Sequence, residues 1–88
     1  MSDLTKNLRK KLLYRSKNRG CRETDILLGQ FATAEIGEFS EAELEVYERF
    51  LDEYDGDIYK WLTGQAEMPE EYINNIGRKL LGFYTSSS

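Results

Sequence analysis

The chain has 88 residues and a net charge of −4, and it contains one cysteine and no histidine. This length suits one small domain with a modest core and little room for a deep catalytic cleft. Without histidine, the commonest acid–base group and the commonest metal ligand are missing. A single cysteine excludes an intramolecular disulfide and a cysteine-rich zinc site, so we expect no bound metal.

Charge is divided unevenly along the chain. Up to Arg22 there are eight basic residues and one acidic residue, whereas the remainder has four basic and fifteen acidic residues. No segment approaches the roughly 20 apolar residues that span a bilayer, and no secretion signal is present. We therefore expect a soluble intracellular protein whose two ends meet different partners or each other.

The first predicted helix runs from about Leu4 to Asn18. Its leucines form one apolar face, because they recur at a helical spacing: Leu4, Leu8 and Leu12, with Leu13 beside them. Gly20 should end this helix, since glycine adopts the left-handed conformation at little cost. The segment is also basic and amphipathic, as mitochondrial transit peptides are. It continues without a linker or a cleavage region, so we assign it to the folded domain.

Two longer helices are expected to follow. The second covers Glu23 to about Ala34, with Glu23 and Asp25 in the first turn, where acids complement the helix dipole. Ser40 and Glu43 have the spacing of a capping box for the third helix. Its buried face should carry Leu44, Tyr47, Leu51 and Tyr54, and Asp55-Gly56-Asp57 should be the turn that ends it.

Two short helices complete the predicted fold. The fourth contains Ile58, Trp61 and Leu62 and ends at Gly64. Pro69 is expected at the first position of the fifth helix, whose apolar residues are Tyr72, Ile73, Ile76, Leu80 and Phe83. Residues 85–88 form a polar tail that we expect to be frayed. The sequence thus predicts an all-α bundle of about five short helices, with one domain over residues 1–84.

Reactive groups give only weak signals. A nucleophilic Cys21 would need a base, and without histidine only Glu23 or a lysine could serve. The carboxylate pair Asp55 and Asp57 fits a turn better than a metal site. The basic first helix permits a small nucleic-acid-binding or regulatory module as an alternative, with side chains along phosphates: Lys6, Arg9, Lys10, Arg15, Lys17 and Arg19. Against this, the helix after the turn begins with acids, where a helix-turn-helix would read bases.

Two segments that follow one another along the chain resemble a known family. "LLYRSKNRGCRETDILLGQFA" is similar to the succinate dehydrogenase assembly factors, which promote flavinylation and carry Arg-Gly-x-x-Glu at the end of the first helix. Here that signature is Arg19, Gly20 and Glu23. "YERFLDEYDGDIYKWL" resembles the later Asp-x-Tyr-x-Trp segment of the family through Asp57, Tyr59 and Trp61, and Pro69 stands where the family has a proline. Cys21 departs from the methionine frequent in the family, at a spacer position.

The resemblance implies a five-helix protein that binds the flavoprotein subunit of succinate dehydrogenase, and in some bacteria that of fumarate reductase. It implies that the factor promotes covalent attachment of FAD to a histidine of that subunit without being an enzyme. FAD is then the cofactor of the partner and is not bound tightly here, because no glycine-rich phosphate loop is present. We expect a monomer in the bacterial cytoplasm, with neither nucleic acid nor membrane as a partner.

The partner-binding residues are expected at the turn between the first two helices, residues 19–25, which we call the corner. Arg19 would supply a forked donor to the partner, Gly20 would permit close backbone approach, and Glu23 would accept hydrogen bonds. Asp25 belongs to the same set. A second rank, whose side chains could equally tie the helices together, contains Arg15, Asp57, Tyr59 and Trp61. For Trp61 we favour a place in the core.

Overall fold

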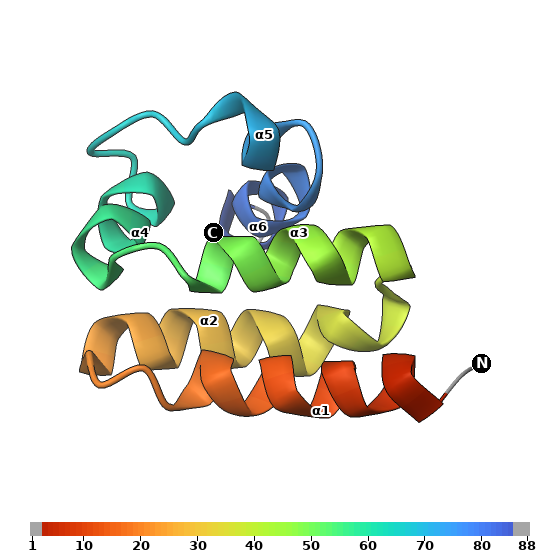
Figure 1. Cartoon of the computed structure of the whole chain (residues 1–88). Helices are drawn as coiled ribbons and strands as arrows, with labels where there is room; N and C mark the ends of the chain where they lie inside the picture. The colour runs from red at the N-terminus through yellow and green to blue at the C-terminus, as the bar shows by residue number, and fades with distance from the viewer. Residues whose placement is uncertain (1–2, 86–88) are drawn as a thin grey trace.

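The computed structural model describes residues 3–85 of the chain, and within them it consists of helices joined by short connections. Helices α1 (Asp3–Lys17) and α2 (Arg22–Glu35) lie side by side and antiparallel in one layer (Figure 1). A 3-10 turn (Ile36–Glu38) then leads the chain up to α3 (Glu41–Leu51), which lies over this pair. The corner consists of the connection between α1 and α2 together with the first turn of α2.

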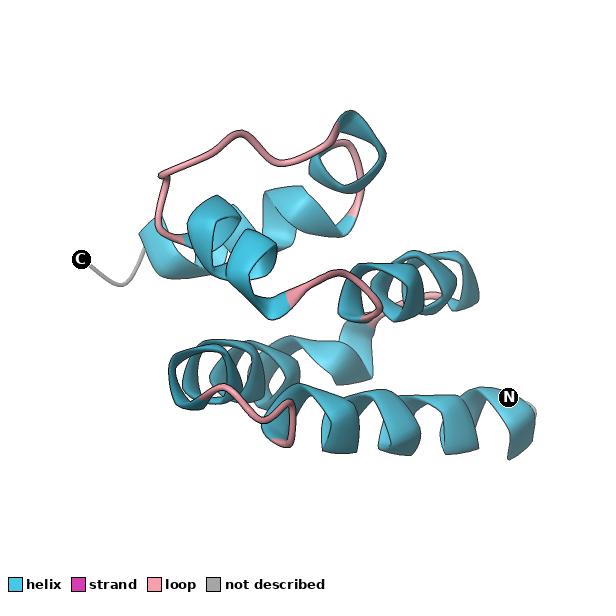
Figure 2. Cartoon of the chain, turned by 60° about the vertical axis from the view of Figure 1, so that its left-hand side comes forward, coloured by secondary structure: helices cyan, strands magenta, loops and turns pink. Residues whose placement is uncertain are grey.

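The second layer is completed by three shorter helices. These are α4 (Asp55–Leu62), α5 (Glu70–Ile73) and α6 (Ile76–Thr85), and a loop arches from α4 to α5 (Figure 2). The predicted all-α bundle is therefore confirmed. The described residues contain six α-helices, one more than expected, and none of these helices is long and apolar enough to cross a membrane.

Large aromatic side chains fill the core between the two layers. Phe31, Phe39, Tyr47, Phe50 and Tyr72 are all at most 2% exposed. Their rings contact one another in sequence, with centroids 5.2–6.2 Å apart. Aromatic pairs at such distances gain energy beyond the area they bury. This cluster joins α2, α3 and α5 into one core.

Helix α1 is an integral part of this core. Leu12 on α1 is fully buried, and Leu8 and Leu13 pack against the core with part of their surface exposed. This basic segment therefore contributes an apolar face to the core. Leu4 is an exception, because it is 81% exposed, so the expected apolar face does not extend to the start of the helix.

Two predicted helix boundaries are confirmed in detail. Gly20 has φ +93° after the end of α1, in the left-handed region that glycine adopts without strain. Ser40 caps α3, where its hydroxyl accepts from the backbone N–H of Glu43 and the Glu43 carboxylate accepts from the backbone N–H of Ser40. This arrangement also lowers the pKa of Glu43, because a backbone donor stabilises the charged carboxylate.

The expected boundary between the third and fourth helices was wrong. Helix α3 already ends at Leu51, and Asp55 begins α4 instead of lying in a terminating turn. Asp55 and Asp57 occupy the first turn of α4, where carboxylates complement the dipole. Tyr54 is the residue before α4 and is 75% exposed, not part of a buried face. Its ring lies against Gly56, whose missing Cβ would stand 2.7 Å from it.

The expected fifth helix is divided into α5 and α6. The chain turns at residues 74–75, which brings the carbonyl oxygen of Tyr72 to 2.6 Å from the position of a Cβ on Gly77. Only glycine fits this close approach. Pro69 caps α5 from the position before it, instead of the first helical position expected. Helix α6 includes Thr85, and the rest of the predicted tail, residues 86–88, lies outside the described residues.

Candidate docking surface

The Arg19 side chain binds the corner to the segment between α3 and α4. Its guanidinium Nε donates to Asp55 Oδ1 at 2.5 Å, and its two terminal nitrogens donate to the carbonyl oxygens of Leu51 (2.6 Å) and Glu53 (2.9 Å). The side chain is only 9% exposed. One forked cation thus caps the end of α3 and holds the start of α4. All three guanidinium nitrogens donate within the chain, so Arg19 supports the corner from inside.

Asp25 and Gly20 shape the backbone of the corner. Asp25 Oδ1 accepts a hydrogen bond from the backbone N–H of Arg19 at 2.5 Å, and the backbone N–H of Asp25 donates to the Cys21 carbonyl at 2.8 Å. These bonds link the residue that precedes Gly20 to the first turn of α2. Gly20 itself is exposed, and no atom outside its neighbours lies within 4 Å of a Cβ built on it. The corner therefore presents an open, fixed stretch of backbone to solvent.

Glu23 lies on the outer side of the corner, beside a groove. Two adjoining hollows of about 250 and 300 Å³ share Glu23 and Tyr59 and run between the start of α2 and helix α4. We call them together the α2–α4 groove, and its wall also includes Cys21, Ile26, Asp55 and Thr63. Glu23 is exposed, and among described residues its one hydrogen-bonding neighbour is the Cys21 thiol, with Sγ 3.7 Å from Oε2. Its carboxylate is available to a partner.

The structure brings most of the expected site residues to this surface, but not all of them. Tyr59 is half-buried and lines the groove opposite Glu23, whereas Asp57 is exposed in the first turn of α4 without lining it. Arg15 lies outside the groove, at the end of α3, where it donates to Asp52 Oδ1 at 2.7 Å and to the Leu51 carbonyl at 3.3 Å. Arg15 therefore ties α1 to the end of α3.

Trp61 lies on the other side of α4, away from the corner. Its indole ring packs against Phe50 at 5.9 Å and Tyr72 at 6.1 Å, measured between centroids, and part of its surface remains exposed. The expectation of a core role is consistent with these contacts. Trp61 and Tyr59 are two positions apart, which places them about 200° apart around a helix, so they serve different surfaces.

Sequence reasoning missed Asp55 as the partner of Arg19. The two residues are 36 positions apart, and Asp55 was expected in a turn of its own. It also missed Ile26, a large apolar side chain that is 48% exposed in the groove. The available signal for Asp55 was the division of charge along the chain, because basic residues prevail up to Arg22 and acidic residues prevail after it. It did not distinguish Asp55 from the neighbouring acids.

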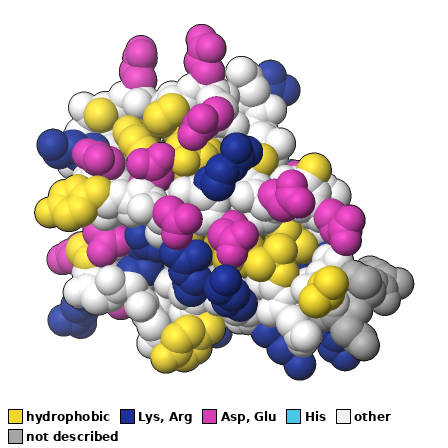
Figure 3. Space-filling view, viewed as in Figure 1, with side chains coloured by type: hydrophobic (Ala, Val, Ile, Leu, Met, Phe, Trp, Pro, Cys, Tyr) yellow, Lys and Arg dark blue, Asp and Glu magenta, His cyan; other side chains and the backbone are white. Residues whose placement is uncertain are grey.

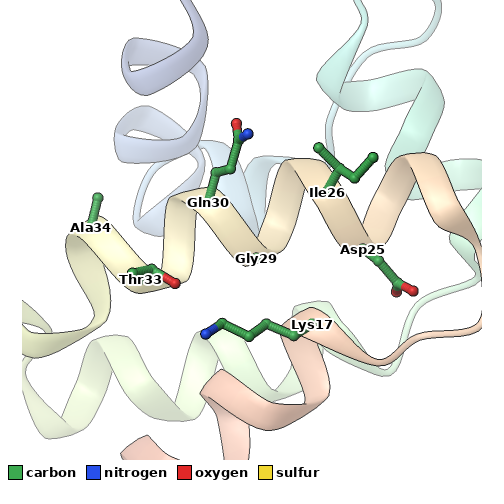
Figure 4. Close-up of a pocket in the computed structure, with 7 residues that line it drawn as sticks. All are labelled: Lys17, Asp25, Ile26, Gly29, Gln30, Thr33 and Ala34. Atoms are coloured by element: carbon green, nitrogen blue, oxygen red, sulfur yellow. The ribbon is translucent and has the colours of Figure 1, made fainter.

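A second depression adjoins the corner on the outer face of α2. Figure 4 shows the Lys17 side chain lying along α2 beside Gly29, with Asp25 at one end and Thr33 toward the other. A Cβ on Gly29 would stand 3.3 Å from Lys17 Cγ, so glycine permits the end of α1 to lie close to α2. The depression is shallow and open to solvent, and its walls mix small residues with the longer side chains of Lys17, Ile26 and Gln30. It has few of the convergent polar groups that a ligand site needs.

Basic side chains are gathered around α1, and acidic ones over the layer above it (Figure 3). Several of the basic groups bind acids or carbonyl groups of the upper layer, as in the pairs Lys11–Glu48, Arg15–Asp52 and Arg19–Asp55. Arg9 likewise donates to the carbonyl oxygen of Phe39 at 2.7 Å. The two oppositely charged parts of the sequence thus meet each other, and a nucleic-acid-binding function is not favoured.

Groups that would hold a metal ion are not assembled in this surface. Within residues 3–85 no three side chains of the types His, Cys, Asp and Glu lie together in a way that could hold one. The α2–α4 groove contains the carboxylates of Glu23 and Asp55, but the latter is paired with Arg19. The arrangement is suited to recognition by shape, by hydrogen bonding and by the exposed carboxylate of Glu23.

Comparisons of the sequence with known proteins show its family. The family model described as "Flavinator of succinate dehydrogenase" matches residues 10–84. A protein of Dictyostelium discoideum named "Succinate dehydrogenase assembly factor 2, mitochondrial" is 49% identical over 69 residues, which cover 78% of this chain and 49% of that protein. A protein of the same name from Scheffersomyces stipitis is 53% identical over 76 residues, 83% of this chain and 51% of its own length.

A third relative of that name, from Schizosaccharomyces pombe, is 39% identical over 77 residues, covering 88% of this chain and 55% of that protein. The chain therefore spans about half the length of the curated relatives it matches. The expected location was wrong: these relatives are eukaryotic proteins named as mitochondrial, and they point to mitochondria instead of the bacterial cytoplasm.

Proposed function

This chain belongs to the family of succinate dehydrogenase flavinators, and we propose that it is an assembly factor that promotes covalent attachment of FAD to the flavoprotein subunit of succinate dehydrogenase. Fumarate reductase, where present, offers a second flavoprotein of the same kind. The family match includes the whole corner and the α2–α4 groove, since both lie between residues 10 and 84. The proposal assigns partner binding to these surfaces because Gly20 and Glu23 are exposed there.

One observation carries the proposal: the corner presents Gly20 and Glu23 outward while Arg19 and Asp25 hold it from inside. In this view Glu23 accepts hydrogen bonds from the flavoprotein, and Gly20 lets the two backbones approach. Arg19 acts as a positioning residue, because its guanidinium already donates to Asp55 and two carbonyl groups. Tyr59 and Ile26 add apolar area beside Glu23.

The factor acts on this view by positioning, not by chemistry of its own. The sequence has no histidine, and the one thiol, Cys21, has a carboxylate and no base of suitable strength beside it. Holding a flexible subunit in the geometry its own reaction needs can lower a barrier by several kcal/mol, of the ~7–11 kcal/mol available from orientation. We therefore propose a non-enzymatic role, with the histidine that receives FAD on the partner.

FAD itself is assigned to the flavoprotein. The α2–α4 groove has carboxylates at Glu23 and Asp55 and no Lys or Arg in its wall, which disfavours the diphosphate of FAD. We further propose that the factor docks as a monomer, because one corner and its adjoining groove form the whole surface. Sedimentation of the isolated protein tests this directly.

The function is tested by in-gel flavin fluorescence of the denatured flavoprotein subunit, in cells that contain the wild-type chain, no chain, or Glu23→Gln. We expect a strong band with the wild type and a weak one in the other two. Glu45→Gln is the matched control, since Glu45 is an exposed helical glutamate on α3 outside the corner. It should retain the wild-type band.

A band of equal intensity without the chain would overturn the proposed activity. An intact band with Glu23→Gln, together with loss in cells that lack the chain, would leave the activity standing and remove Glu23 from the interface. Tight DNA or RNA binding that weakens steeply with salt would instead support the nucleic-acid alternative.

A further inference from the structure

A second groove lies on the side of α4 that carries Trp61. It has a volume of about 580 Å³ and is bounded by the end of α4, the loop to α5, and helices α5 and α6. Its apolar surface comes from Trp61, Met68, Ile73 and Leu81. We call it the α4–α6 groove. None of its lining residues belongs to the corner or to the α2–α4 groove.

The floor of this groove is held in place by the core. Trp61 rests on the rings of Phe50 and Tyr72, and Met68 is 7% exposed. Gly77 lets Met68 approach α6, because a Cβ there would stand 2.6 Å from Met68 Sδ. The loop is fixed as well, since the backbone N–H groups of residues 65 and 66 both donate to the Lys60 carbonyl. The groove is therefore formed before anything binds to it.

The rim of the groove is acidic. Glu67 and Glu70 line it and are exposed, and no Lys or Arg does so. Within residues 3–85 neither glutamate makes a salt bridge, in contrast to Glu43, Glu48 and Asp52. An apolar floor beneath two unpaired carboxylates selects a ligand with both an apolar group and positive charge.

We propose that the α4–α6 groove docks a segment of another protein in which a large apolar side chain is flanked by Lys or Arg. The apolar side chain covers Trp61 and Leu81, and the flanking cations pair with Glu67 and Glu70. A free lipid or nucleotide fits poorly, because phosphate would meet the two carboxylates. This surface is additional to the corner, so it does not depend on the proposed flavinylation role.

Trp61 provides the measurement, since it is the sole tryptophan of the sequence. The full chain is titrated with a 12-residue peptide that contains two leucines and four lysines and no aromatic residue. We expect a saturable change in Trp61 emission, weakened by raising the NaCl concentration. Two matched peptides, with glutamates for the lysines or serines for the leucines, should produce no saturable change.

Two double variants test the location. Glu67→Lys with Glu70→Lys should weaken peptide binding about tenfold, because two attractions become repulsions. Glu38→Lys with Glu45→Lys alters the net charge equally at exposed positions outside the groove, and it should change binding by no more than about twofold. Circular dichroism checks that both variants are folded.

Several outcomes would overturn the proposal. These are the absence of a saturable signal, an equal response to the glutamate peptide, or equal weakening by the two double variants. Concentration-dependent self-association that changes Trp61 emission without peptide would also overturn it, because the occupant would then be a second copy of this chain.

Discussion

The corner and the aromatic core connect the same two layers by different forces. In the core, Phe50 contacts Tyr47, Trp61 and Tyr72 through ring surfaces with centroids 5.2–6.2 Å apart. In the corner, the Arg19 guanidinium makes three hydrogen bonds of 2.5–2.9 Å to the segment between α3 and α4. Ring packing is tolerant of small shifts, whereas forked hydrogen bonds fix direction as well as distance.

This difference separates stability from recognition. The core excludes water and supplies most of the folding free energy. The corner contributes less stability but determines where Gly20 and Glu23 lie relative to α4. Variants in the core should therefore change folding and leave the docking affinity of the folded fraction intact. Variants in the corner should change affinity in a protein that remains folded.

The largest expected effect is on stability, from Phe50→Ala. Phe50 is fully buried, and removing its ring leaves a cavity between three aromatic neighbours. We expect a loss of about 4 kcal/mol in the free energy of unfolding, measured by urea denaturation. Phe50→Leu, which fills most of the space, should cost only about 1 kcal/mol. Phe50→Leu should bind the flavoprotein subunit like the wild type. Weakened binding by the folded variant would contradict the division between a core that determines stability and a corner that determines recognition.

Arg19→Ala is the next largest effect. It leaves the Asp55 carboxylate and the Leu51 and Glu53 carbonyl groups without their donor, and we expect a loss of about 3 kcal/mol. Arg19→Lys keeps the charge but cannot reach all three acceptors, so it should recover less than half of that stability. Urea denaturation and flavoprotein binding are measured together. If folded Arg19→Lys bound the flavoprotein subunit with wild-type affinity, the three guanidinium hydrogen bonds would not be what positions the corner.

The sequence predicts contacts between residues that are close along the chain better than contacts between distant residues, and the two regions differ in this respect. The capping box at Ser40 and the left-handed Gly20 were predictable, because each is decided by residues within four positions. The burial of Tyr47 followed from helical spacing on α3. The aromatic core was therefore predictable in composition, although not in which rings meet.

The long-range features could not be obtained from local patterns. Arg19 was expected to face a partner, but its fork is used on Asp55, 36 residues away. The division of the last predicted helix at residues 74–75 depends on the close approach of Gly77 to Tyr72 and Met68, which no spacing rule reveals. Local patterns placed Arg19, Gly20 and Glu23 in one turn, but they did not show that Arg19 is turned inward while Glu23 is exposed.

High pH should weaken the junction between the two regions. Burial raises the pKa of Tyr47 to about 12, while the positive charge of Arg19 opposes the rise. Ser16 donates to the Leu12 carbonyl, so the Tyr47 hydroxyl must donate to Ser16 Oγ, 2.6 Å away, and needs its proton. Because the unfolded chain loses this proton near pH 10, stability should be complete below that pH and fall by about 2 kcal/mol by pH 12.

Urea denaturation across this pH range checks the effect. Tyr47→Phe removes the titrating group and should flatten part of the decline, at a loss of about 1 kcal/mol at neutral pH. Part of the decline should remain, because burial and the hydrogen bond to Glu53 also raise the pKa of Tyr72. Tyr14→Phe is the control, since Tyr14 is 68% exposed. An identical alkaline decline in Tyr47→Phe and wild type would exclude Tyr47 as its source.

The smallest effect on stability, and the sharpest test of recognition, comes from a pair of glycines. Gly20 and Gly64 have similar left-handed conformations, with φ +93° and +80°, and a Cβ on either would have no atom within 4 Å beyond its neighbours. Asparagine tolerates this conformation better than other side chains, so Gly20→Asn and Gly64→Asn should each cost less than about 1 kcal/mol. The two variants therefore match in strain and in space.

They differ in position, because Gly20 is in the corner, whereas Gly64 follows α4 and lines the α4–α6 groove, away from the corner. Gly20→Asn should weaken binding to the flavoprotein subunit by about tenfold or more, since its side chain occupies the space through which the partner approaches. Gly64→Asn should bind like the wild type. Equal affinities for all three proteins would mean that the partner does not approach the corner, whereas equal weakening would mean that strain, not docking, links these glycines to function.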